Sequence, residues 1–166
     1  MTIRGPERTV RQSVLDRLID RDPRSSFDTQ PSTFGESVRQ LKLALLRDVE
    51  WLLNTRRIPE PAPDAYPELQ RSVYHYGLPD TTSLSGDDPN VRRRLQREIE
   101  ECIRLFEPRL MSVTVTPVAS TGEKKRDLRF TIEAILRMDP NPERIVFDTV
   151  LDVSHGGFSV AGDANA

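Results

Sequence analysis

The chain has 166 residues, of which 36% are hydrophobic and 30% are charged, and its formal net charge is −2. This composition is too apolar for a disordered chain, and the length allows one domain with its own core. The near-neutral balance excludes a general attraction to nucleic acid or acidic membranes. No stretch approaches the roughly 20 apolar residues that a membrane-spanning helix needs.

The polar ends and the single cysteine predict a simple organisation. We expect flexible tails at residues 1–10 and 161–166 and a single domain at 11–160. The first ten residues lack the apolar segment of a signal peptide. Because Cys102 is the one cysteine, an internal disulfide is impossible and a reducing compartment is expected. These features predict a soluble cytoplasmic protein.

Apolar residues at helical spacing predict two helices in the N-terminal part. The stripe of the first, short helix is Val14, Leu15, Leu18 and Ile19. A longer helix is expected at about 35–56, where Thr33 and Glu36 have capping-box spacing. Its stripe is Val38, Leu41, Leu45, Val49 and Leu52. Arg56 and Arg57 at its C-terminal end would complement the helix dipole.

Residues 57–88 are irregular, with four prolines that exclude a continuous helix. We interpret them as an ordered loop, and not as a linker between two domains, because neither half has a balanced core. A third helix then begins with Asp88 as N-cap and Pro89 as its first residue. We expect Glu98, Glu100 and Glu101 to balance its basic run, which predicts a solvated helix face instead of a phosphate-binding patch. The run is Arg92, Arg93 and Arg94.

Alternating polar and apolar residues predict strands in the C-terminal part. The first strand places Met111, Val113 and Val115 on one face, and the second, from Leu128 to Met138, has one solvated face. A short last strand follows Gly156 and Gly157, at Phe158, Ser159 and Val160. The predicted fold class is α+β, with N-terminal helices packed on one face of a C-terminal antiparallel β-meander.

The predicted strand at about 144–152 is apolar on both faces. Val146 and Val150 lie on the face opposite Ile145, Phe147 and Leu151. Such a strand is either covered on both sides or leaves one face for a partner.

No residue pattern indicates a catalytic, cofactor or metal site. His75 and His155 do not stand at metal-ligand spacing, and Gly156-Gly157 opens no phosphate-binding helix. Glycoside hydrolysis needs only two carboxylates, so a peptidoglycan hydrolase using Glu107 is the enzymatic alternative. Because nothing in the sequence indicates a sugar cleft, we predict a protein that is not an enzyme and uses no cofactor.

Glu107, Pro108 and Arg109 join the third helix to the first strand. Pro108 disfavours helical geometry at the preceding residue, so the helix should end near Phe106. Glu107 then lies at the negative end of the helix dipole, where a carboxylate is unfavourable unless a cation or a partner offsets it. An internal ion pair with Arg109 and a contact with another protein would both do so.

Five motifs occur in one order along most of the chain: Ser13–Leu18, Arg47–Arg57, Tyr76–Asp80, Phe106–Leu110 and Phe147–Phe158. In this order they resemble the TssE family of type VI secretion baseplate subunits, which is grouped with the sheath-initiator wedge proteins of contractile phage tails. The resemblance implies a structural role. The alternatives are a lysozyme-like peptidoglycan hydrolase and a regulatory binding module of the anti-adaptor type, which uses a related fold.

The resemblance also implies partners. The chain would join TssF, TssG and TssK in a baseplate wedge on the cytoplasmic side of the inner membrane. It would start the TssB–TssC sheath by strand addition at the sheet edge near 144–152. Neither nucleic acid nor direct membrane insertion is implied. The expected partner-binding residues are Glu107, Pro108, Arg109, Arg56, Arg57, Val146 and Val150.

Overall fold

The structure, a computed structural model, forms two compact units that divide within one helix. The units are Met1–Leu45 with Ala164–Ala166, and Leu46–Asp163. The described residues are 10, 12–19, 23–25, 33–81, 88–118, 127–139 and 141–162. The predicted tail at 1–10 lies, except for Val10, outside them.

Two helices begin in the first unit. Helix α1, Val14–Leu18, starts at Ser13, whose hydroxyl accepts the Asp16 N–H at 3.1 Å. Its predicted apolar stripe is exposed, with Leu18 75% exposed, while Asp16 is buried. Helix α2, Phe34–Asn54, starts at Thr33, whose hydroxyl accepts the Glu36 N–H, as the capping-box spacing predicts.

Helix α2 ends two residues earlier than expected. Its last turn contains no basic residue, so Arg56 and Arg57 lie beyond the helix. The prediction that they complement its dipole is therefore wrong. The Thr55 N–H donates to the Trp51 and Leu52 carbonyls, and the chain then turns away from the helix axis.

Residues after α2 form an ordered loop with two short 3₁₀ helices, η1 (Pro67–Arg71) and η2 (Val73–His75). Backbone bonds close its base: the Arg57 N–H donates to the Leu78 carbonyl at 2.8 Å, and the Leu78 N–H donates to the Thr55 carbonyl at 2.9 Å. Gly77 has φ +96°, and a Cβ there would lie 2.2 Å from the Thr55 oxygen. Only glycine fits this close approach.

Helix α3, Pro89–Phe106, has the predicted start and end. Asp88 is its N-cap and accepts the Asn90 N–H at 2.8 Å. Its buried stripe is Leu95, Ile99, Cys102 and Ile103. In the part of the chain that the structure describes, no helix is long and apolar enough to cross a membrane.

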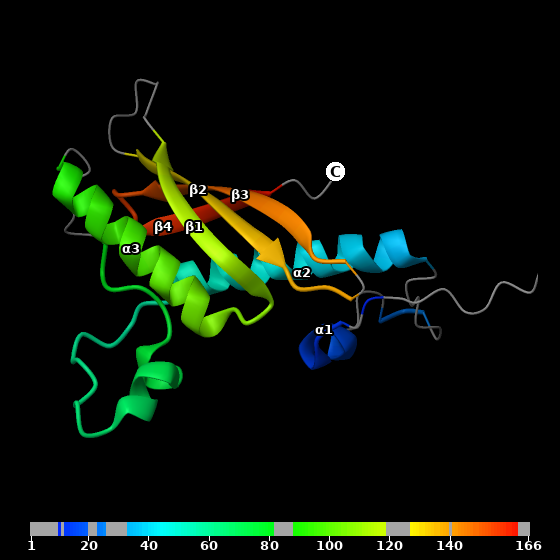
Figure 1. Cartoon of the computed structure of the whole chain (residues 1–166), viewed down its shortest axis with the longest axis horizontal. Helices are drawn as coiled ribbons and strands as arrows, with labels where there is room; N and C mark the ends of the chain where they lie inside the picture. Colours follow the sequence, from blue (N-terminus) through cyan, green and yellow to red (C-terminus); the bar gives the residue numbers. More distant parts are fainter. Residues whose placement is uncertain are drawn as a thin grey trace, which may run out of the picture. The chain divides into compact units, whose positions relative to one another are not determined.

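Four antiparallel strands form one sheet in the order β1-β2-β3-β4, the predicted meander (Figure 1). They are β1 (Leu110–Val118), β2 (Asp127–Leu136), β3 (Glu143–Asp152) and β4 (Gly157–Gly162). Alternate residues of β2 and β3 are buried on one face, and α3 packs against β1. The fold class is therefore α+β, as predicted.

A bulge in β1 changes which side chains reach the core. The register shifts between Met111 and Thr114, and Ser112 has φ +52°. Leu110, Val113 and Val115 are buried, whereas Met111 is only half-buried. The prediction that Met111 shares one face with Val113 and Val115 is therefore wrong, because strict alternation assumes an unbroken register.

Strand β3 is an interior strand. It pairs with β2 on one side and with β4 on the other, so the expectation that residues 144–152 provide a sheet edge is wrong. The edge on that side is β4. This strand continues through Gly162, so two residues that we assigned to the C-terminal tail are part of the sheet.

Candidate functional site

The Glu107-Pro108-Arg109 corner joins α3 to β1 in a tight turn. The Glu107 N–H closes the last helical turn on the Ile103 carbonyl at 2.8 Å, and the Glu107 carbonyl accepts the Leu110 N–H at 3.0 Å. The Arg109 carbonyl accepts the Arg137 N–H at 2.8 Å, which ties the corner to the end of β2. Pro108 has no N–H, so it cannot extend the helix.

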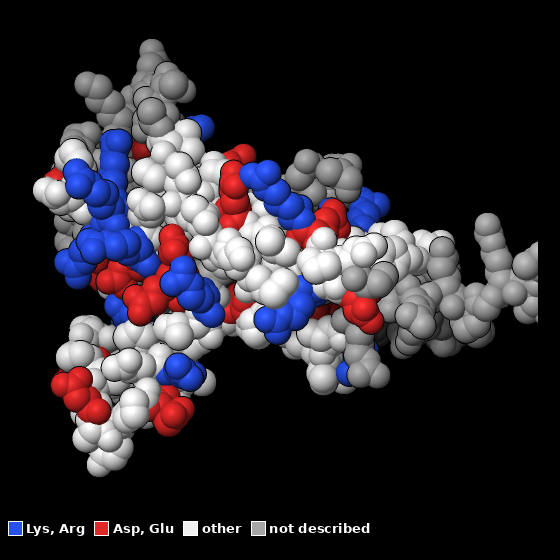
Figure 2. Space-filling model, viewed as in Figure 1, with Lys and Arg blue, Asp and Glu red and all other residues white. Residues whose placement is uncertain are grey.

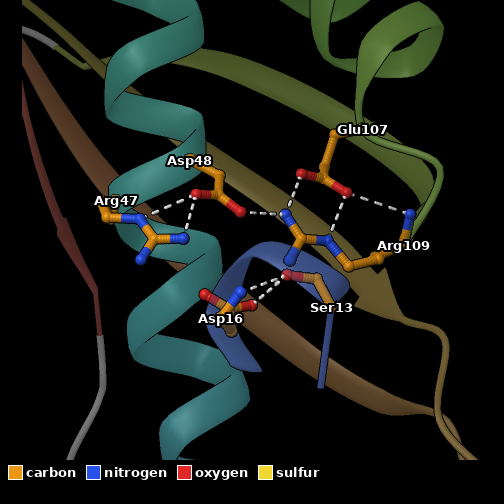
Figure 3. Close-up of polar contacts among 6 residues, drawn as sticks. All are labelled: Ser13, Asp16, Arg47, Asp48, Glu107 and Arg109. Atoms are coloured by element: carbon orange, nitrogen blue, oxygen red, sulfur yellow. Dashed lines mark hydrogen bonds and ion pairs between the residues drawn. The ribbon is translucent and has the colours of Figure 1, made fainter. Parts of the chain in front are cut away.

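The side chains of this corner form an ion network with α2 (Figure 3). Arg109 donates through Nε to Glu107 Oε1 at 2.7 Å and through Nη2 to Glu107 Oε2 at 2.5 Å. The same Nη2 reaches Asp48 Oδ2 at 2.7 Å. Arg47 binds the other Asp48 oxygen, Oδ1, at 2.7 Å. Two carboxylates thus share one guanidinium.

This network makes the corner part of the fold. Glu107 is only 5% exposed, and Arg109 binds it through two nitrogens, a strong geometry for an arginine–carboxylate pair. The hydrogen bonds that Arg109 donates to Glu107, and then those to Asp48, raise the pKa of Arg109 above its usual range. Of the two alternatives that the sequence left open, the internal ion pair is present.

One nitrogen of Arg109 is left over. Its Nη1 is buried and has no hydrogen-bond partner among the described residues. A buried donor without an acceptor costs about 1–3 kcal/mol. Nε and Nη2 of Arg109 are therefore hydrogen-bonded to Glu107 and Asp48, whereas Nη1 has no acceptor among the described residues.

Asp48 is the site residue that sequence reasoning missed. Helical spacing gave a usable signal, because Asp48 stands three residues after Leu45 and four before Leu52, both of which are buried. An acidic residue on the core side of an amphipathic helix needs a cation. Only the fold shows that this cation is Arg109, which is 61 residues away.

Arg56 and Arg57 lie at the base of the ordered loop, each in a different setting. Arg57 donates to Glu98 Oε2 at 3.1 Å, and its Nη1 lies 2.7 Å from His75 Nε2. Arg56 makes an exposed ion pair with Asp80 at 3.1 Å. Neither belongs to the Glu107–Arg109 network, so the structure does not unite the predicted contact residues in one site.

The small hollow beside Arg57 is lined by polar groups and one thiol. Cys102 donates to the Gly77 carbonyl at 3.5 Å, and burial raises the pKa of its thiol to about 12. This thiol is protonated at neutral pH, so Cys102 behaves as a small buried residue and not as a reactive thiol. Among the described residues, no three His, Cys, Asp or Glu side chains gather where they could hold a metal ion.

Val146 and Val150 are half-buried on β3, on the face opposite the core. Their neighbours are polar pairs: the Thr131 hydroxyl donates to Asp148 at 2.8 Å, and Arg144 binds Glu133 at 2.6 Å. This face has a mixed character, with two valines among charged and hydroxyl groups.

Comparison with known proteins identifies the family. The model of the family described as baseplate wedge protein gp25 matches residues 39–141, more than half of the chain. The match includes Asp48 and the Glu107–Arg109 corner and ends before β3. No curated protein matches the chain. The chain therefore belongs to the gp25 family of baseplate wedge proteins, whose type VI secretion homologue is TssE.

Proposed function

We propose that this chain is a structural subunit of a type VI secretion baseplate on the cytoplasmic side of the inner membrane. It joins TssF, TssG and TssK in the wedge and starts the TssB–TssC sheath. The family match carries this proposal, because a baseplate wedge family has a structural role. The two contacts involve different parts of the second unit: the Glu107–Arg109 corner for the wedge and the outer sheet edge for the sheath.

The wedge contact uses the unsatisfied nitrogen of Arg109. Because Nη1 is buried, a carbonyl or carboxylate of a wedge subunit accepts from it once the covering side chains move aside, while Glu107 and Asp48 keep the guanidinium oriented. Pro108 fixes the direction of the corner. Of the two arginines near α2, Arg56 is the better additional contact, because its side chain is 54% exposed, whereas Arg57 is engaged with Glu98 and His75.

The sheath contact uses β4, the last strand of the sheet. The Asn54 side chain accepts the Phe158 N–H at 2.8 Å and donates to the Phe158 carbonyl at 2.9 Å, so these main-chain groups point away from β3. Main-chain direction repeats every second residue in an antiparallel strand. The N–H and carbonyl groups of Val160 and Gly162 therefore also face outward, where a sheath strand can pair with them.

The opposite edge of the sheet is less suitable. Gln96 of α3 donates to the Val115 carbonyl on β1 at 2.7 Å, and α3 packs against this strand. Val146 and Val150 then contribute through their side chains, because the main chain of β3 is paired on both sides. Because α3 packs against β1 and the main chain of β3 is already paired, strand addition is limited to the Val160–Gly162 end of β4.

Val160→Pro tests the sheath contact. Proline removes the outward N–H of Val160, which makes no bond to β3, so the substitution should leave the fold intact and prevent strand addition. Val160→Ala keeps the N–H and is the matched control. We expect recovery of TssB–TssC with the wedge to be lost in Val160→Pro alone. Equal recovery with both variants, at equal melting temperature, would contradict the proposal.

Arg109→Lys tests the wedge contact. Lysine keeps the charge near Glu107 but removes the forked geometry and Nη1. Asp48→Asn is the control, because it weakens the same network and keeps Arg109. Recovery of TssF and TssG should fall much further in Arg109→Lys than in Asp48→Asn at matched stability. If recovery only follows the melting temperature in both variants, the corner is purely structural.

Zymography on peptidoglycan tests the enzymatic alternative. Both oxygens of Glu107 accept hydrogen bonds from Arg109, and its side chain is only 7% exposed, so it is poorly placed to meet a sugar. We expect no clearing by the purified protein. Clearing that Glu107→Gln abolishes would replace the structural proposal with a hydrolase.

A further inference from the structure

The N-terminal half of α3 carries an unbalanced group of positive charges. Arg93, Arg94 and Arg97, here called the arginine patch, are exposed, and the first turn of the helix contains no acidic residue. Figure 2 shows a blue surface over this end of α3. The patch is separate from the Glu107–Arg109 corner, which lies at the other end of the same helix, about 18 Å away along its axis.

Two of the three acids that should balance the patch, Glu98 and Glu100, are engaged elsewhere. Glu98 binds Arg57 at 3.1 Å, and Glu100 binds Arg104 at 2.6 Å. Among the described residues, no carboxylate pairs with the arginine patch, and Arg97 makes only a 3.4 Å bond to the Arg93 carbonyl. Glu98 and Glu100 therefore do not pair with Arg93 or Arg94 in the part of the chain that the structure describes.

The position of the patch is also electrostatically unfavourable within its own helix. The N-terminal end of a helix carries partial positive charge, so cations there are destabilising. Arg93 and Arg97 are four residues apart, where like charges repel each other. Asp88, the acid at this end within the described residues, already accepts the Asn90 N–H. This arrangement is slightly unfavourable for the isolated helix, and a bound anion would offset that cost.

We propose that the arginine patch binds a short acidic segment of a partner protein, rich in Asp and Glu. Arginine binds carboxylates with two parallel hydrogen bonds. Residues 93–97 span about 6 Å of helix, the length of about two residues of an extended peptide. Two or three carboxylates therefore suffice.

The surrounding charges select against longer polyanions. The chain has a net charge of −2, and Glu98, Glu100 and Glu101 follow within the next turns of α3. A DNA duplex or an anionic membrane presents many charges over a wide area and would meet these acids as well. A short acidic segment meets only the arginines. This proposal does not depend on the baseplate assignment.

The test measures binding to the full chain of a dye-labelled eight-residue peptide that has Asp-Glu-Asp at its centre and Gly and Ser elsewhere. One variant replaces the patch: Arg93→Gln, Arg94→Gln and Arg97→Gln. The control makes the same charge change at three exposed arginines of the sheet region: Arg129→Gln, Arg137→Gln and Arg144→Gln. A DNA duplex and vesicles containing phosphatidylserine serve as competing polyanions. Fluorescence anisotropy is recorded at low and at physiological salt.

We expect the patch variant to bind the peptide about tenfold more weakly or worse, and the control variant to bind within about twofold of the original chain. Binding should also weaken as salt rises. Absence of peptide binding, or equal loss in both variants, would overturn the proposal. Tighter patch-dependent binding of DNA or vesicles than of the peptide would also overturn it, and would assign the patch to that class instead.

Discussion

The charged side chains at the two ends of α3 differ in whether other residues of the fold pair with them. At the C-terminal end, Glu107, Arg109 and Asp48 lie in one hydrogen-bonded network, and Glu107 is buried. At the N-terminal end, the arginine patch is exposed and has no acidic partner among the described residues. Charges that are paired within the fold stabilise it, whereas charges that the fold leaves unpaired are available to a partner; at the corner, only Nη1 of Arg109 is left without an acceptor among the described residues. Substitutions at the two ends should therefore have different consequences.

Glu107→Ala should have the largest effect on stability. It leaves Arg109 largely buried with only Asp48 as partner, and breaking such a pair costs about 3–5 kcal/mol. Urea unfolding measures this loss. The control is Glu133→Ala, which breaks the exposed pair with Arg144 and should cost at most about 1 kcal/mol. Similar losses in the two variants would show that the network does not stabilise the fold.

Asp48→Asn should have an intermediate effect. It removes the negative charge shared by Arg47 and Arg109 but keeps one acceptor, so the expected loss is about 1.5–3 kcal/mol. Asp148→Asn is the matched control, because its exposed side chain accepts only from Thr131 and should change stability by about 0.5 kcal/mol or less. Equal unfolding midpoints for the two variants would contradict the shared role of Asp48.

His75 should produce a smaller, pH-dependent effect. Burial lowers its pKa below the usual 6.5, and Arg57 acts in the same direction, while Glu101 and Glu98 partly oppose them. The folded protein then binds fewer protons than the unfolded chain, so this contribution is full above about pH 6.5 and is lost as the pH falls. The melting temperature should drop between about pH 8 and pH 5.5. His75→Gln should reduce this drop; an unchanged drop would assign it to other groups.

Neutralising the arginine patch should have the smallest effect, and in the opposite direction. Replacing Arg93, Arg94 and Arg97 with Gln removes repulsion at the positive end of the helix dipole. Each change should be neutral or stabilise the protein by a few tenths of a kcal/mol, roughly. Thermal melting at low salt measures this gain. A loss above about 1 kcal/mol would show that the patch supports the fold and would remove the contrast between the two ends.

Much of the fold could be predicted from the sequence because its signals are local. Periodic apolar residues located both long helices and the four strands, and Asp88-Pro89 and Pro108 marked the two ends of α3. The position of Met111 could not be predicted, because the bulge at Ser112 has no side-chain pattern of its own.

The candidate site depends on contacts between distant segments and was only partly predictable. Glu107 and Arg109 are neighbours in sequence, so their pairing could be expected. The contact between Asp48 and Arg109 could be predicted only by knowing that α2 passes the α3–β1 corner. The interior position of β3 follows from the pairing of β4, and the short apolar pattern of β4 does not indicate which strand it pairs with.

The most direct test of the central claim is residue-resolved hydrogen exchange of the chain, bound to TssF and TssG, before and after TssB–TssC is added. If the outer edge of β4 receives a sheath strand, the amides of Val160 and Gly162 should become protected. The Phe158 amide, already bonded to Asn54, should change little. Sheath binding that leaves Val160 and Gly162 unprotected would contradict the account.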